Sequence, residues 1–190
     1  MFKCFRILIV GTAALQFSTI EASALEEIIS YGVKIPQHVS GGKLVAFEDF
    51  EKKGYPGFGS GASYRASNWL ANFYVYDLQR TNISDQVASN DIKIELENAT
   101  KDVWKVNPNS PPKMLSQFSI KDNAKLDRFI CNSFRYNHPN LGDSNSAVCL
   151  GAWNKKFLKI RLSIEFDGDI KASVSKFSNP FISSLWRNKF

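Results

Sequence analysis

The stretch that decides the fold is residues 157–166, which read FLKIRLSIEF. Apolar side chains occupy positions 158, 160, 162, 164 and 166, and most of the positions between them are polar. Because successive side chains of a β-strand point to opposite faces of its sheet, this alternation predicts a strand with one buried face. The rest of the chain is expected to cover that face.

A second strand is predicted over residues 145–153, and the short turn Asn154-Lys155-Lys156 would join the two in a β-hairpin. If Trp153 pairs with Phe157, residue 150 faces residue 160. Farther back, residues 127–136 are expected to pair with 145–153 around a turn at 138–142. This register gathers on one face Ile130, Phe134, Val148, Leu150, Leu158, Ile160 and Leu162. That apolar set predicts a core face.

The same pairing places Cys131 directly opposite Cys149. An oxidising compartment would favour a disulfide between them, and closing a loop of this length contributes about 3 kcal/mol of stability. The alternative is two free, buried thiols. Neither a CxxC pair nor a histidine cluster accompanies the two cysteines, so no metal site is expected.

The remaining elements are read from shorter patterns. Strands are predicted at 44–50, at 64–78 (one strand, or two broken near 67–68) and at 114–120. Apolar residues at spacings of three and four predict two amphipathic helices, 84–105 and 170–187. Ser84 is the expected N-cap of the first helix, and Pro180 should kink or split the second. The predicted class is α+β, a single domain over 25–190 in which an antiparallel meander sheet has both helices packed on one face.

Residues 1–24 have the three regions of a signal peptide in order. Lys3 and Arg6 are positive, residues 7–17 are mostly apolar, and the stretch Ala22-Ser23-Ala24 offers the small residues that signal peptidase accepts. The apolar part is shorter than the about 20 residues that a membrane span needs. We therefore expect cleavage near Ala24 and a periplasmic or secreted mature chain without a transmembrane span. The alternative is an amphipathic or buried N-terminal helix.

Charge and motifs argue against several functions. The net charge of +6 is dispersed and forms no basic run, so nucleic-acid binding is not expected. The glycine-rich residues 57–61 lack the Gly-Lys-Ser/Thr ending of a phosphate loop and precede a strand, which favours a tight turn or bulge. His38 and His138 are the only histidines. We expect no catalytic residue and no cofactor, and an envelope hydrolase that uses His138 or a carboxylate is the alternative.

One predicted surface combines aromatic rings with positive charge. The sheet face opposite the predicted core would carry Phe129, Trp153, Phe157, Lys159 and Arg161. These side chains could hold a ligand by stacking and by charge, so we predict them as the candidate binding face. The alternative is that the N-terminal strand pair, or Tyr74 and Tyr76, covers this face as a second layer.

The C-terminal tail is aromatic and basic. Its residues of these kinds are Phe177, Phe181, Trp186, Arg187, Lys189 and Phe190. Such a tail could touch an anionic membrane surface. The other interpretation, which we favour, is that its apolar residues complete the core.

Residues 56–59 (PGFG), Tyr64 and residues 73–77 (FYVYD), together with the strand 158–166 and the closing helix, resemble small exported bacterial proteins with no assigned activity. The order of elements is also similar to the α+β sandwich of the photosystem accessory protein PsbP and its relatives. This resemblance implies a fold and carries no functional residue. We predict an exported, non-enzymatic domain with a binding or accessory role in the cell envelope, whose partner is an envelope or extracellular protein, a glycan or a lipid.

Overall fold

The computed structural model describes residues 27–105 and 111–186. Its centre is an eight-stranded antiparallel sheet with the strand order β3-β4-β5-β6-β10-β9-β8-β7. The strands are β3 (His38–Val39), β4 (Gly42–Asp49), β5 (Ser60–Arg65), β6 (Trp69–Tyr76), β7 (Lys113–Lys121), β8 (Asp127–His138), β9 (Gly142–Trp153) and β10 (Lys156–Glu165). A separate hairpin is formed by β1 (Ile28–Ser30) and β2 (Val33–Ile35), and the helices are α1 (Asn90–Lys105) and α2 (Ile170–Trp186).

The mixed α+β class and the consecutive antiparallel strands from β7 to β10 are confirmed. The sheet is larger than the predicted meander, because β6 pairs along the free edge of β10 and β5, β4 and β3 continue from it. The predicted disulfide is also confirmed: Cys131 and Cys149 stand opposite each other in β8 and β9, and their sulfur atoms are 2.08 Å apart.

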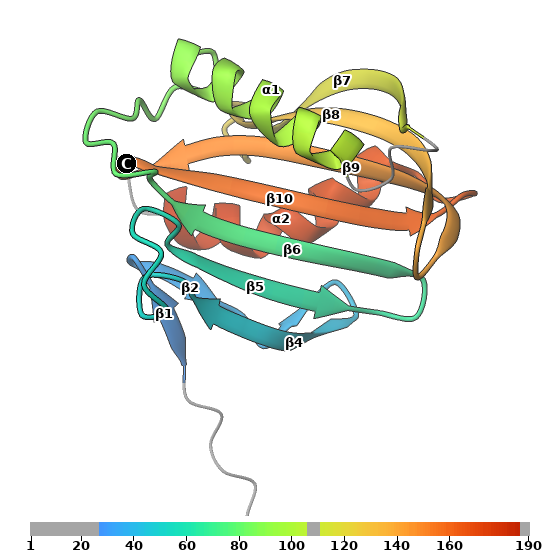
Figure 1. Ribbon diagram of the computed structural model, residues 1–190, viewed down its shortest axis with the longest axis horizontal. Helices are drawn as coiled ribbons and strands as arrows, with labels where there is room; N and C mark the ends of the chain where they lie inside the picture. The colour runs from blue at the N-terminus through green and yellow to red at the C-terminus, as the bar shows by residue number, and fades with distance from the viewer. Residues whose placement is uncertain (1–26, 106–110, 187–190) are drawn as a thin grey trace, which may run out of the picture.

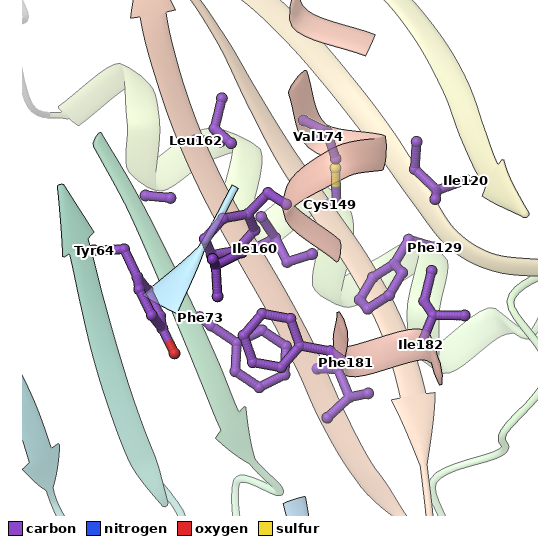
Figure 2. Close-up of a cluster of buried hydrophobic side chains, with 14 of the residues drawn as sticks. Tyr64, Phe73, Ile120, Phe129, Cys149, Ile160, Leu162, Val174, Phe181 and Ile182 are labelled. Carbon is purple, nitrogen blue, oxygen red and sulfur yellow. The ribbon is translucent and has the colours of Figure 1, made fainter. Parts of the chain in front are cut away.

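The two helices lie on opposite faces of the sheet, so the prediction that both pack on one face is wrong (Figure 1). Figure 2 shows the core beneath α2, where Phe181 stacks on Phe73 of β6 with ring centres 4.0 Å apart, and where Ile160 and Cys149 also lie. A second core lies beneath α1 and joins its apolar stripe to the other sheet face. That core contains Ile92, Leu96, Ala99, Val103, Phe134, Val148, Leu150, Ala152 and Phe157.

A one-residue error at the β9–β10 turn accounts for the wrong layer prediction. Trp153 pairs with Lys156 instead of Phe157, so the turn contains only Asn154 and Lys155. Both have positive φ, 49° and 60°, the geometry of a two-residue turn whose twist suits a hairpin. Moving the register by one residue turns every side chain of a strand to the other face. Ile160 therefore stands opposite Cys149, and the predicted core set divides between the two faces.

Helix boundaries follow the capping residues. At α2, the Asp169 carboxylate accepts the backbone N–H of Ala172 at 3.0 Å, which satisfies an otherwise free donor of the first turn. α1 begins at Asn90 and not at 84, and Ser89 accepts the N–H of Ile92 at 3.4 Å. Ser84 instead accepts the N–H of Gln86 in a local turn. Pro180 lies inside α2 and does not split it.

Candidate functional site

α1 covers only part of its sheet face. It packs over β8 and β9 and contacts Tyr76 at the end of β6, whereas β4 and β5 have no helix above them on the same side (Figure 1). Side chains that point to this face along β10 therefore meet three environments in turn. Phe157 is buried in the core beneath α1, Lys159 lies at the edge of that core, and Arg161 lies beyond it.

A cleft of about 410 Å³ opens where α1 ends its cover of the sheet. One part of its wall is aromatic and apolar, formed by Phe50, Phe58, Tyr74, Tyr76 and Leu78. The other part is polar, formed by Glu95, Asn98, Asp102 and Lys159. A concave, mostly aromatic site with a few converging polar groups is the usual form of a small-ligand pocket, and the volume lies in the range of such pockets.

The ammonium of Lys159 lies at the aromatic side of the cleft. Its Nζ is 4.9 Å from the ring centre of Tyr74 and 5.0 Å from that of Tyr76, within cation–π range. The geometry follows from register, because Lys159 is the direct cross-strand partner of Tyr74. Within residues 27–105 and 111–186 this ammonium has no hydrogen bond and no ion pair. Burial lowers its pKa, and Glu95 and Asp102 oppose that shift by their negative charge.

Glu95 is the buried carboxylate of the cleft. It projects from the inner face of α1, and its Oε1 accepts the Tyr76 hydroxyl at 2.6 Å. Burial raises the pKa of Tyr76 well above its ordinary value, and the charge of Glu95 and the hydrogen bond to it add to the shift. Tyr76 is thus held as a neutral donor, while Asp102 at the cleft rim pairs with Lys105 at 2.8 Å.

The glycine-rich loop supplies the outer wall of the cleft. The N–H groups of Gly57 and Gly59 donate to the Glu51 carboxylate at 2.8 and 3.2 Å, so these amides already hold an anion. Gly59 has φ +59°, and a Cβ there would meet the Val75 carbonyl oxygen at 1.9 Å. The tight turn expected from the sequence thus brings Phe58 over the cleft, where 57% of its surface is exposed.

The structure does not bring the five residues of the predicted binding face together. Phe129 and Trp153 lie on the α2 side. Phe129 is fully buried with its ring edge-on to Trp186, and the Trp153 ring lies against Gly32 in the β1–β2 turn. Phe157, Lys159 and Arg161 lie on the α1 side. Each of the two expected covering layers lies beside part of the predicted face. The N-terminal hairpin covers Trp153, and Tyr74 and Tyr76 flank Lys159.

His138 does not have the surroundings of a hydrolase base. Its Nδ1 accepts the N–H of Asn140 at 3.0 Å, whereas the histidine of a catalytic triad donates from that nitrogen to a carboxylate. Asp143, the nearby acid in the sequence, is held by Arg135 at 2.7 Å. Burial and the charge of Arg161 lower the pKa of His138. In the described part of the chain, no three histidine, cysteine or acidic side chains gather as metal ligands would.

The C-terminal helix supports the interpretation that its apolar residues complete the core. Phe177, Phe181 and Trp186 are all buried against the sheet. Residues 187–190, which carry the rest of the basic tail, lie outside the described residues, as do residues 1–24 of the expected signal peptide. Among the described residues, no helix is both long and apolar enough to cross a membrane.

Comparison of the chain with models of protein families, with curated proteins and with solved structures found no match. The chemistry of the cleft therefore has to be inferred from its own side chains.

Proposed function

We propose that this protein is an exported, non-enzymatic domain that binds a saccharide in the cleft beside α1. The observation that carries the proposal is the ammonium of Lys159 held between the Tyr74 and Tyr76 rings without a hydrogen-bond or ion-pair partner in the described residues. A cation half removed from water is costly unless something binds it, and the cleft leaves room for a polar ligand to do so.

The chemistry of the lining fits a sugar ring. A pyranose has apolar C–H faces that pack on aromatic side chains, and a rim of hydroxyl groups that both donate and accept hydrogen bonds. Tyr74 and Phe58 supply aromatic surface, Lys159 supplies donors, and Glu95 supplies an acceptor. The amide of Asn98 can do either. A lipid acyl chain fits less well, because it would leave the buried carboxylate and the ammonium against hydrocarbon.

Export is supported by the disulfide. Cys131 and Cys149 are joined and fully buried, and such bonds persist in oxidising compartments and are rare in the cytosol. The test is the intact mass of the protein recovered from the envelope fraction. A mass that lacks residues 1–24 supports export by a cleaved signal peptide, and a mass that retains them contradicts it.

Saccharide binding is tested by presenting the purified protein to an array of neutral and acidic oligosaccharides, followed by calorimetric titration of each hit. Binding should fall at least about tenfold in Tyr74→Ala and in Lys159→Met, because each removes a cleft contact worth about 1.4 kcal/mol or more. Trp104→Ala is the matched control, since Trp104 is an exposed aromatic residue of α1 that does not line the cleft. Absence of any hit, or hits that both cleft variants retain, would overturn the proposal.

A further inference from the structure

A second hollow lies on the same sheet face, at the far end of β10 from the β9–β10 turn. It measures about 250 Å³, and its polar lining comes from Asn72, Tyr136, His138, Asn140, Arg161 and Ser163. These residues belong to β6, β10 and β8 and to the loop after β8, so the hollow joins strands that are far apart in the sequence. Among the described residues, no acidic side chain lines it.

The guanidinium of Arg161 has no partner within 27–105 and 111–186. Arg80, Arg128 and Arg135 each pair with an aspartate, whereas Arg161 makes no ion pair and no hydrogen bond in those ranges although it is partly buried. A guanidinium carries five donors in a planar fork that matches a carboxylate or a phosphate group. The charge of Arg161 also acts on both the hollow and the saccharide cleft. It lowers the pKa of His138 in the hollow and the pKa of Lys159 in the cleft.

Tyr136 supplies an independent observation. The residue is 5% exposed and lines the hollow, and its hydroxyl is buried without a hydrogen-bond partner in the described ranges. Buried hydroxyls without a partner are uncommon, and each one calls for an explanation. The adjacent His138 has its Nδ1 occupied by the Asn140 amide, so only Nε2 is left for another contact.

We propose that this hollow binds an oxyanion, a carboxylate or a phosphate-type group, through Arg161 and Tyr136. The hollow and the saccharide cleft are neighbours, because Lys159 and Arg161 are two residues apart on one face of β10, about 7 Å along the strand. The oxyanion is therefore the acidic group of the ligand that occupies the cleft, which makes that ligand an acidic saccharide. This second step rests on the proposed function, whereas the anion site stands without it.

The anion site is tested with sulfate, which stays doubly charged across the titration of histidine. Proton NMR of the two histidines gives the pKa of His138 with and without sulfate, and His38 is the internal reference. A bound anion stabilises the imidazolium, so sulfate should raise the pKa of His138. Arg161→Gln should abolish that rise. Arg65→Gln makes the same charge change at an exposed position that does not line the hollow, and should preserve the rise.

Tyr136→Phe keeps the ring and removes only the unpartnered hydroxyl. We expect weaker sulfate binding at an unchanged or higher melting temperature, because the hydroxyl makes no hydrogen bond with the described residues that the substitution could remove. A His138 pKa that sulfate does not move, or moves equally in Arg161→Gln, overturns the anion site.

The acidic ligand is tested with a trisaccharide of galacturonic acid and its neutral methyl ester. The acid should bind about tenfold more tightly, and Arg161→Gln should remove the difference. Equal binding of acid and ester contradicts the acidic saccharide while leaving the cleft as a saccharide site. A sulfate response without binding of any saccharide keeps the anion site and overturns the proposed function instead.

Discussion

The Nζ of Lys159 lies 4.9 Å from the ring centre of Tyr74, its direct partner across the β10–β6 ladder. The pair joins the fourth residue of β10 to the sixth residue of β6, at the point where α1 leaves the sheet uncovered. Cross-strand pairing thus fixes the distance between the charge and the ring without help from any loop. The cleft is consequently built on two interior strands of the sheet, and sites on strands hold their side chains more precisely than sites on loops.

Lys159→Met should weaken saccharide binding and change how stability depends on pH. Burial lowers the pKa of Lys159 below the 10.5 of an unfolded lysine. Between the folded and unfolded pKa values the unfolded chain binds more protons, so stability conferred at this site rises as pH increases through that window. Urea unfolding of both proteins at several pH values up to 10.5 should show the stability of the parent rising relative to that of the variant. A parallel rise in the variant would contradict the assignment to Lys159.

Removing the disulfide should destabilise the fold without changing its class. Cys131 and Cys149 are 18 residues apart and fully buried beneath α2, so Cys131→Ala/Cys149→Ala should lose about 3 kcal/mol of unfolding free energy. Urea unfolding measures the loss. A reductant should lower the midpoint of the parent and leave that of the double variant unchanged. If the reductant does not affect the parent, the bond does not contribute to stability.

The sequence was sufficient to predict those strands and strand pairings that depend on local patterns alone. The alternation at 157–166 indicated β10, and the symmetric spacing of Cys131 and Cys149 about the intervening turn gave the β8–β9 register. At the next turn the same reasoning was one residue wrong, because Asn154 and Lys155 both adopt positive φ without a glycine to signal it. Because of that single error, Phe157 and Lys159 were predicted on the sheet face away from both helices, whereas they lie on the α1 side.

The candidate site was less accessible to sequence analysis because it is assembled from distant segments. Two signals were present: the same-face spacing of Tyr74 and Tyr76, and the acid Glu95 within the apolar stripe of α1. Neither signal predicts a cleft by itself, because the cleft forms only when α1 packs on the sheet face opposite α2. Phe58 reaches the cleft only through the turn that Gly57 and Gly59 permit.

The β9–β10 turn itself can be tested. Lys155 has φ 60°, which glycine adopts without the cost that a Cβ imposes, so Lys155→Gly should stabilise the protein by about 0.5–1 kcal/mol. Lys155→Ala loses the same charge but keeps the Cβ, and should give no such gain. Chemical unfolding of the three proteins makes the comparison. A gain of equal size in both variants would assign the effect to charge instead of backbone conformation.

The glycine-rich loop offers a matched pair of substitutions. A Cβ at Gly59 would meet the Val75 carbonyl oxygen at 1.9 Å, whereas a Cβ at Gly54 has no atom within 4 Å, and both glycines have positive φ. Gly54→Ala should cost about 1 kcal/mol from backbone strain alone. Gly59→Ala should cost at least about 2 kcal/mol more and should also weaken saccharide binding, because it displaces Phe58. If thermal unfolding shows that Gly54→Ala and Gly59→Ala lose the same stability, the close approach of this loop to β6 is contradicted.

The hydrogen bond from Tyr76 to Glu95 can be separated from the packing of the tyrosine ring. Tyr76→Phe leaves the buried Glu95 carboxylate without this donor, so it should lose about 1–3 kcal/mol of unfolding free energy. Tyr136→Phe is the control, because it removes a buried hydroxyl that has no partner in the described residues and should cost nothing. In Glu95→Gln the acceptor is neutral, and the cost of adding Tyr76→Phe should shrink by the coupling energy of the pair. If Tyr76→Phe costs the same in both backgrounds, the negative charge of Glu95 adds nothing to the strength of this hydrogen bond.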